Sequence, residues 1–583
     1  MSGRSSGLSL SDRRAAIRRW LDQFASEAAN SKLLAASAGV GVAVGLLVAL
    51  LEWIVIEVVL HAVLNWPLWI QVFAPLVGLL LAQAMLRVVR GGLSPATSEE
   101  YIRQFHARHP SFPIPEVAAR LAAGVSTIGL GGAVGLEGPS IYLGGATGSS
   151  FYKRLEDQLG RGAAQQLITA GAAAGVAAVF QAPATGVVFA MEAPYRDDVA
   201  HRALLPSLVA AAASFLTFAA IPFVHHGSVV DFAFDRSVDS AELLGAVALG
   251  IGAGLGGRLF AWFVRKAKIL SKHVSPWLAA GVGGLILGAL ALWSAQVFGE
   301  PLTLGPGVTA LDWLSSDSSL RLIVALFFFR AVATLVSVGA GGVGGLFIPL
   351  AVQGVLLGRV VGEALDRLGL GSAEDARLWP ILGLAAFLAA GYRTPIAAVM
   401  FVAESASGAA VVPALVAAAV SQLVAGASSV SAAQREERLG GLESRLALPV
   451  GSVIETDVLT VPPDASISEF VWFHALGQRQ PVVPVVDGSR YLGLCSVHDA
   501  TRIDRADWDD TKVTEIMDTD APTGHPWWTL RDAVAALGRS RRDLMAVTDT
   551  KDSFVGVVRD DEIVKLGEIL VETEPSDSEP TDG

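Results

Sequence analysis

The residues best placed to do chemistry lie in a glycine-rich break within apolar sequence. This break reads Gly135, Leu136, Glu137, Gly138 and Pro139. Glycine and proline interrupt a helix, and free N–H groups at the start of the next helix form a binding site for an anion. A carboxylate beside that site can occupy it as a tethered anion, and protonation would release it. We therefore expect Glu137 to gate an anion pathway in response to pH; the alternative is a glutamate that only caps a broken helix.

A second break of the same kind lies 210 residues further along the chain. Gly345, Leu346, Phe347, Ile348 and Pro349 keep the glycine and the proline but carry no acid. The N–H groups of Leu346 and Phe347 can bind an anion while the apolar side chains exclude water. As a lone motif this segment would indicate helix packing. As a copy of the first break, it predicts a second part of the anion site.

The repeat extends beyond the two breaks. Pro183–Glu192 matches Pro395–Glu404 at an offset of 212, and we expect the glutamate closing each segment to lie at a helix end. In lipid, a broken helix is tolerated where its free backbone groups face protein or a polar cavity. Repeats built around broken helices are common in transporters. The sequence therefore predicts an all-α membrane domain of two repeats, about 33–225 and 240–433, with the site between them.

Composition supports a multi-pass membrane protein. Of the 583 residues, 52% are apolar and 17% charged, and the mean hydropathy is +0.51. Because one span needs about 20 apolar residues, we expect about ten or more spans, several of them broken. Four arginines precede the first apolar run, which places the N-terminus in the cytoplasm. We interpret residues 1–32 as an amphipathic helix on the bilayer surface, the alternative being a solvated basic helix. No secretory signal is evident.

Hydropathy falls after residue 432, where a soluble α/β region begins. A polar linker, 434–448, precedes two units of similar order, 449–505 and 511–568, and an acidic tail, 569–583, that we expect to be disordered. The net charge of −12 argues against nucleic-acid binding. The single cysteine, Cys495, excludes a disulfide framework and a cysteine metal site. No nucleophile or phosphate-loop signature indicates an enzyme.

Together, these motifs resemble those of the CLC family of chloride channels and proton-coupled chloride transporters, over about 35–570. The resemblance rests on the two breaks and on Gly171–Glu192. It implies a homodimer with one pore per subunit, inverted repeats, chloride or another small anion as the transported ion, and a cytoplasmic CBS pair, which the two C-terminal units resemble. It also implies a location in the plasma or inner membrane.

Carried over position by position, the resemblance assigns roles to several residues. Glu137 matches the gating glutamate, and the backbones of Leu346 and Phe347 match the ligands of the central anion. The segment 135–139 would surround the external anion site. Leu136 stands where the family has a basic residue, which implies a less positive outer approach.

Three departures from the family pattern affect the site. In the first anion element the hydroxyl ligand would be Ser94, although Leu93 is a rival for that position. Val430 is our alignment for the family's central tyrosine, and we expect Tyr392 to be no counterpart of it because it belongs to another element. Ala193 stands where proton-coupled members carry an inner glutamate. We therefore expect few hydroxyls at the central site, weak halide binding and no inner proton acceptor.

These departures favour a passive chloride channel gated by Glu137. The first alternative is a proton/anion antiporter for chloride or fluoride, and the second is a CBS-based ligand sensor with a vestigial pore. In the CBS-like region, Ser496 and Asp499 match one nucleotide-binding pattern, whereas the equivalent in the second unit is Arg559 with Glu562. An adenine nucleotide is thus a weaker interpretation there than a structural dimer clamp. No other cofactor and no metal are expected.

Overall fold

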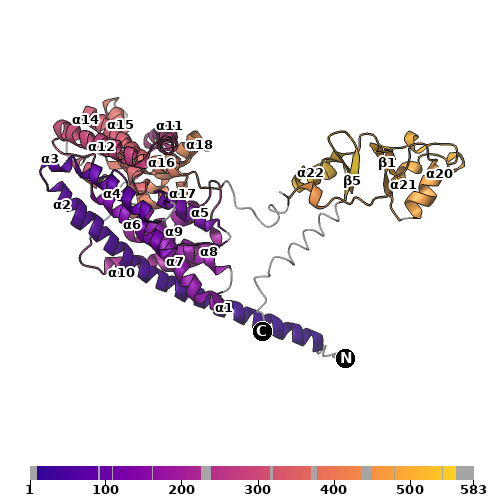
Figure 1. Ribbon diagram of the computed structural model, residues 1–583, viewed down its shortest axis with the longest axis horizontal. Helices are drawn as coiled ribbons and strands as arrows, with labels where there is room; N and C mark the ends of the chain where they lie inside the picture. Colours follow the sequence, from indigo (N-terminus) through magenta and orange to yellow (C-terminus); the bar gives the residue numbers. More distant parts are fainter. Residues whose placement is uncertain are drawn as a thin grey trace. The chain divides into compact units, whose positions relative to one another are not determined.

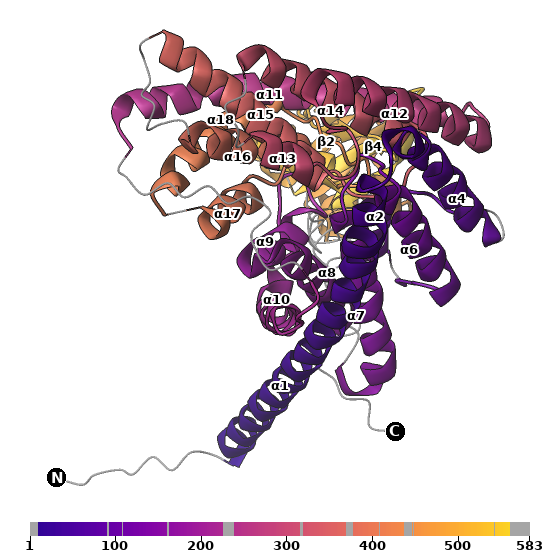
Figure 2. The same cartoon turned by 90° about the vertical axis from the view of Figure 1, so that its left-hand side faces the viewer.

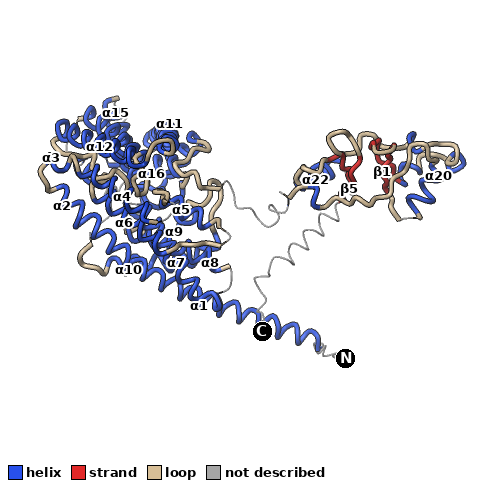
Figure 3. Tube along the Cα trace, viewed as in Figure 1, coloured by secondary structure: helices blue, strands red, loops and turns tan. Residues whose placement is uncertain are grey.

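The computed structural model divides into two compact units, 1–438 and 439–583. Figure 3 shows that the first contains helices and loops, whereas the strands belong to the second. The structure describes residues 10–89, 92–107, 109–159, 162–224, 238–314, 319–368, 377–406, 408–435, 446, 448–477, 479–540 and 543–559.

The first half of the N-terminal unit runs from α1 to α10. Its elements are α1 (Leu10–Glu52), the π-helix η1 (Trp53–Leu60), α2 (His61–Leu64), α3 (Leu68–Gln71), α4 (Ala74–Val88), α5 (Thr97–Phe105), α6 (Ile114–Gly129), α7 (Glu137–Leu159), α8 (Ala163–Phe180), α9 (Pro183–Glu192), η2 (His201–Ala203) and α10 (Leu204–Ala219). In Figure 1 they carry the indigo-to-magenta colours. Figure 2 shows α10 beside α1, and the two helices pack together.

The second half of this unit runs from α11 to α18. Its elements are α11 (Ser240–Ser271), α12 (Pro276–Phe298), α13 (Val308–Leu314), α14 (Leu320–Gly339), α15 (Phe347–Arg367), α16 (Leu378–Tyr392), α17 (Pro395–Ser405), η4 (Gly408–Ala410) and α18 (Val411–Ala425). The packing of the halves is similar, since α7 lies against α8 as α15 lies against α16. Contacts such as α9 with α17 and α4 with α12 join the two halves.

In the described part of the chain, nine helices are long and apolar enough to cross a membrane. Two shorter apolar helices, α16 and α17, add to them. The expected breaks are present before α9 and α17, because proline stands at the first position of each. The mostly helical, multi-pass membrane fold is therefore as predicted.

The boundary that we placed at residue 32 falls inside α1, which runs without a break from Leu10 to Glu52. No glycine or proline occurs between residues 10 and 38, so nothing in the chain stops the helix there. The surface helix that we expected is continuous in backbone with the first span.

The C-terminal unit contains two small sheets. In the first, β1 (Val482–Asp487) pairs antiparallel with β2 (Arg490–Ser496); in the second, β3 (Thr523–Gly524) pairs parallel with β4 (Leu544–Thr548), which pairs antiparallel with β5 (Phe554–Arg559). The helices are η5 (Val450–Ser452), α20 (Ile467–Glu469), the π-helix η6 (Phe470–Leu476), α21 (Val497–Ala500), η7 (Arg505–Asp507), η8 (Val513–Glu515) and α22 (Leu530–Ser540). The final helix that we expected, and the acidic tail, lie outside the described residues.

Glycines let α11 approach α18 closely. A Cβ on Gly250 would lie 2.7 Å from the Ala417 carbonyl oxygen, and a Cβ on Gly254 would lie 2.7 Å from Val424 Cβ. Gly252, on the other side of α11, would meet nothing within 4 Å. Residues four apart share one helix face, so Gly250 and Gly254 face α18 whereas Gly252 does not.

Gly254→Val is expected to lower the free energy of unfolding by about 1–3 kcal/mol, because an overpacked contact must separate. The measurement is reversible unfolding in mixed micelles. Gly252→Val is the matched control, since it makes the same change of helix propensity on the open face of the helix. Equal losses in both variants would contradict this view of the contact.

Candidate functional site

The two glycine-rich breaks lie against each other. Gly135 N–H donates to the Gly345 carbonyl oxygen at 2.9 Å, and Gly345 N–H donates to the Gly135 carbonyl oxygen at 2.7 Å. This antiparallel bridge joins segments 210 residues apart. The helix α7 begins at Glu137 and α15 begins at Phe347, so the bridge brings two helix N-termini to one place.

The side chain of Glu137 fills the space between these two helix starts. It is 1% exposed, and its Oε1 accepts a hydrogen bond from Phe347 N–H at 2.5 Å. Its Oε2 is buried and has no hydrogen-bond partner among the described residues. A carboxylate from one repeat thus occupies the N-terminus of the other repeat's helix, where a free anion would also be stabilised.

Glycine is required on both sides of this carboxylate. A Cβ on Gly135 would lie 2.0 Å from Glu137 Oε2, and a Cβ on Gly345 would lie 2.2 Å from Oε1. A Cβ on Gly138 would lie 2.7 Å from Thr97 Oγ1 and 2.8 Å from Gly345 N. Any side chain at these positions would therefore displace the carboxylate or the backbone that holds it.

The other residues of the two breaks form the walls of the site. Leu136 is buried, and its carbonyl oxygen begins α7 by accepting from Ser140 N–H at 3.0 Å. Pro139 packs toward Gly124 on α6. Ile348 is buried in the first turn of α15. These residues exclude water from the anion position rather than adding charge to it.

Tyr392 corrects our expectation that few hydroxyls lie near the central site. Leu346 N–H donates to the Tyr392 hydroxyl at 3.2 Å. The residue closes α16, a different element from that of Val430, yet its ring reaches the same backbone group that we expected to bind the anion. Sequence alignment missed it because the contact depends on how α16 packs against α15.

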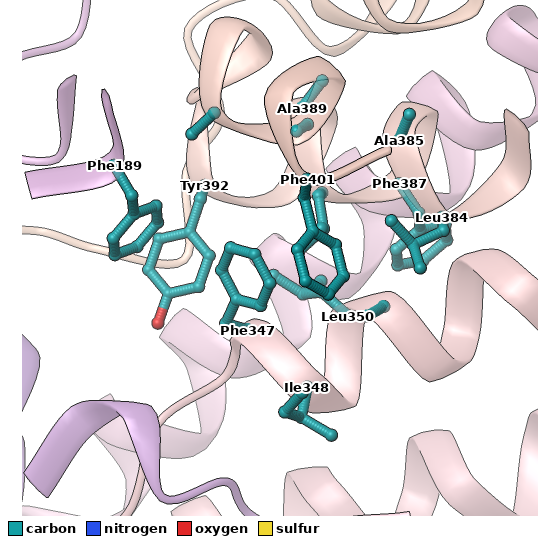
Figure 4. Close-up of a cluster of buried hydrophobic side chains, with 14 of the residues drawn as sticks. Phe189, Phe347, Ile348, Leu350, Leu384, Ala385, Phe387, Ala389, Tyr392 and Phe401 are labelled. Atoms are coloured by element: carbon teal, nitrogen blue, oxygen red, sulfur yellow. The ribbon is translucent and has the colours of Figure 1, made fainter. Parts of the chain in front are cut away.

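Aromatic rings surround the start of α15. The Phe347 ring lies 4.3 Å from Phe180, 5.3 Å from Phe189 and 5.5 Å from Phe401, measured between centroids. The Phe189 and Tyr392 rings are 5.5 Å apart. Figure 4 shows this cluster, with the Tyr392 hydroxyl directed away from the packed rings. Such a wall keeps the anion position dry, which strengthens each N–H contact to an anion.

A cavity of about 600 Å³ leads to this site, and it joins several of the predicted residues. The predicted residues Ser94, Leu346 and Val430 line it, together with Thr97 and Tyr392. The backbone of Val430 is engaged, because its N–H donates to Gly391 and its carbonyl oxygen accepts from Lys268. Val430 therefore contributes only an apolar side chain to the cavity.

Thr97 is a hydroxyl that the sequence analysis did not single out. It is fully buried, and its Oγ1 has no hydrogen-bond partner within the described ranges. Ser94, our candidate for this role, is partly exposed, and its Oγ already accepts a weak bond from Ala96 N–H at 3.4 Å. Thr97 is thus better placed than Ser94 to donate to an anion. No local signal in the sequence marks it, because its place depends on how α5 packs against the breaks.

At the end of α9, Ala193 offers no acid. Its N–H donates to the Phe189 carbonyl oxygen at 2.9 Å, and its carbonyl oxygen accepts from Gln434 Nε2 at 3.1 Å. The methyl group is buried. The position expected to hold an inner proton acceptor is therefore a neutral packing residue.

The glutamates that close α9 and α17 cap each other's helices. Glu192 accepts from Ile396 N–H at 3.1 Å and from Ala397 N–H at 2.8 Å. Glu404 accepts from the N–H groups of Ala184 and Thr185 at 2.8 and 2.7 Å. Each acid thus neutralises the start of the helix in the other repeat, which agrees with our interpretation of both as helix-end residues.

In the C-terminal unit, the candidate nucleotide residues satisfy each other. Ser496 Oγ donates to Asp499 Oδ2 at 2.5 Å and accepts from Asp499 N–H at 3.2 Å, which caps α21. Arg502 pairs with the same carboxylate at 3.5 Å. Burial, together with the Asp499 carboxylate, raises the pKa of the Cys495 thiol to about 12, so this thiol stays protonated. Glu562 lies outside the described residues. Nothing here supports a bound adenine nucleotide.

Comparison with known protein families identifies the membrane unit. The model of the voltage gated chloride channel family matches residues 78–426, which is more than half of the chain. The chain belongs to the CLC family. Members of this family are transporters or channels of anions, not enzymes, and chloride is an ion that they transport.

Curated relatives carry chloride-channel names. The chain is 26% identical over 342 residues to a putative chloride channel protein ClcB-like of Ralstonia nicotianae. The matched region covers 58% of this chain and 78% of the relative. It is 31% identical over 279 residues to the voltage-gated ClC-type chloride channel ClcB of Salmonella typhi, covering 47% and 64%. The ClcB channel of Escherichia coli is 26% identical over 366 residues, covering 61% and 84%.

Solved structures with the same fold carry transporter titles. A slow cyanobacterial Cl⁻/H⁺ antiporter has a TM-score of 0.59 at 22% identity, covering 67% of this chain and 94% of that one. A CLC-type fluoride/proton antiporter also gives 0.59 at 22% identity, covering 70% and 98%. A eukaryotic CLC transporter gives 0.56 at 18% identity, covering 91% and 97%.

Gly345→Ala is expected to expel the Glu137 carboxylate, because the new methyl group would overlap Oε1. Anion flux in liposomes should then lose most of its pH dependence, because the carboxylate no longer competes with the anion for the Phe347 N–H group. Gly339→Ala is the matched control, since a Cβ there has only an ordinary contact at 3.5 Å. A Gly345→Ala protein with the pH profile of the unaltered chain would show that the carboxylate does not need this space.

Thr97→Val keeps the shape of the side chain and removes the donor. Loss of a hydrogen bond to a charged ligand costs about 1.5 kcal/mol or more, so halide affinity should fall about tenfold. Calorimetric titration with chloride and fluoride measures it. Ser94→Ala should change affinity much less, and the reverse order of the two variants would restore Ser94 as the ligand.

Proposed function

We propose that this CLC protein is a proton-coupled anion antiporter for chloride or fluoride. The observation that carries the proposal is the Glu137 carboxylate, which accepts the Phe347 N–H at 2.5 Å in the place of an anion. The antiporter titles of two structures with this fold support the proposal over the passive channel that the sequence favoured. That likeness shows the fold alone, so the proposal rests mainly on the position of the Glu137 carboxylate at the start of α15.

The exchange follows from competition for one set of N–H groups. An ionised Glu137 holds the start of α15 and excludes a free anion from it. Protonation removes the charge that these N–H groups stabilise, so the side chain can leave and an anion can enter. The neighbouring hydroxyls of Tyr392 and Thr97 are available to complete the shell of the anion. One site thus binds either an anion or an ionised glutamate.

A passive chloride channel remains the second candidate, and Ala193 favours it. An alanine carries no proton, so protons would need another path between Glu137 and the side of the membrane where α9 ends. The cavity of about 600 Å³ that reaches Tyr392 has room for a chain of water molecules that could serve this purpose. A ligand sensor with a vestigial pore is disfavoured because the Glu137 motif is intact and assembled.

We propose that the protein is a homodimer in the bacterial inner membrane, with its N-terminus and C-terminal unit in the cytoplasm. The ClcB relatives support this membrane, and the arginines before the first span support this orientation. Exposed leucines on α10 and α18 offer an apolar face for a second copy: Leu204, Leu205, Leu208, Leu216, Leu415 and Leu423.

We propose that the C-terminal unit is a CBS pair with a structural role. Two sheets with similar helix–strand–strand order support this interpretation. The likeness to a eukaryotic CLC transporter covers 91% of the chain and so extends beyond the N-terminal unit. The mutual capping of Ser496 and Asp499 argues for a structural role rather than nucleotide binding.

Purified protein in liposomes tests the coupling. An imposed chloride or fluoride gradient should drive uphill proton movement in the unaltered protein. Glu137→Gln should abolish the proton movement while anion flux continues, because glutamine cannot exchange a proton. Glu363→Gln is the control, since that acid pairs with Arg367 on the surface of α15. Anion flux without any proton movement in the unaltered protein would establish the passive channel instead.

A further inference from the structure

Cations gather on one side of the cavity that leads to the anion site. Its lining residues in the described part of the chain include four cations and one acid: Arg103, Arg265, Lys268, Lys272 and Glu99. Lys272 is exposed, so the cationic side reaches solvent. Leu346 and Tyr392 line the same cavity. An ion that enters this cavity therefore shares it with the cations.

Three of the cations form a stripe on α11. Arg265, Lys268 and Lys272 are spaced i, i+3 and i+7, so they share one helix face over about 10 Å. We call these three residues the cationic stripe. The neighbouring Lys266 is not in the cavity lining and lies 5.7 Å from the Trp262 ring. The stripe is thus a feature of one face and not of the whole helix end.

Most of the stripe lacks an acidic partner. Arg265 Nη1 donates to the Ser429 carbonyl oxygen at 3.0 Å and has no carboxylate partner among the residues that the structure describes. Lys272 likewise makes no ion pair within those ranges. Lys268 is held by Glu99 Oε1 at 2.6 Å and by the Val430 carbonyl oxygen at 3.1 Å. Among the described residues, Arg265 and Lys272 thus line the cavity without a carboxylate partner, whereas Lys268 is held by Glu99.

The size of the cavity exceeds the needs of a halide. A single water molecule takes about 30 Å³ of liquid and a halide ion is of similar size, against about 600 Å³ here. Several cations in a row suit an extended anion with charge at intervals, and arginine and lysine bind phosphate oxygens through charge-assisted hydrogen bonds. The size of the cavity and the spacing of its cations therefore leave room for a ligand larger and more highly charged than chloride.

We propose that the cationic stripe binds a chain of phosphates, such as a di- or triphosphate, at the mouth of this cavity, where the ligand blocks the transported anion. The phosphate chain lies along α11, with Arg265 and Lys272 as its main partners. Lys268 joins when its bond to Glu99 is released. A ligand lodged there stands between solvent and the anion site at Leu346 and Tyr392, and its negative charge repels the permeating anion.

Calorimetric titration of the full-length protein with inorganic tripolyphosphate tests the site directly. Lys272→Met removes one contact from an exposed position and should weaken binding about tenfold. Lys266→Met is the matched control and should leave affinity unchanged. Glu99→Gln should tighten binding, because it frees Lys268 for the ligand. Absence of binding to the unaltered protein, or equal affinity in Lys272→Met, would overturn the proposal.

The block of transport is tested in liposomes and rests on the proposed anion transport. Tripolyphosphate should inhibit anion flux when present on the side of the stripe, and Lys272→Met should relieve the inhibition. Binding without inhibition would overturn the block, whereas absence of flux at any ligand concentration would overturn the proposed transport and not the site. Equal affinity for ATP and tripolyphosphate would show that the phosphate chain is recognised. Tighter ATP binding that survives Lys272→Met would place the ligand elsewhere and contradict the proposal.

Discussion

The geometry of the anion site is set by the hydrogen bond from Phe347 N–H to the Glu137 carboxylate. A buried carboxylate is costly unless something stabilises its charge, and here the N-terminus of α15 does so. This requirement fixes the nearby backbone: Gly135 and Gly345 must lack side chains, and their bridge must hold the two helix starts together. The aromatic wall then keeps water from competing for the same N–H group.

Much of this site could be predicted from the sequence, because the residues that form it belong to short local motifs. Glycine, proline and a lone glutamate mark a broken helix, and the copy of the motif predicted a paired site between repeats. Thr97 and Tyr392 were not predicted in this role, because nothing local distinguishes a threonine or a tyrosine that faces a cavity from one that faces lipid. Their place depends on how α5 and α16 pack against the breaks.

Other features of the fold were predicted less well for related physical reasons. The apolar runs predicted the membrane spans. The change of composition near residue 32 does not interrupt α1, because alanine, arginine, lysine and glutamate favour a helix much as leucine does. The cations of α11 are visible in the sequence at helical spacing. The sequence analysis did not single them out, because only the packing of α11 places them beside the cavity.

The reciprocal caps of Glu192 and Glu404 carry a consequence for the order in which the chain is synthesised. The N–H groups of Ala184 and Thr185 donate to a carboxylate 220 and 219 residues later in the chain. Until the ribosome has made that residue, the first half emerges with an uncapped helix start and an unpaired Glu192. Contacts of such long sequence separation form late and slowly. The first repeat therefore cannot complete its folded structure until the second repeat has been synthesised.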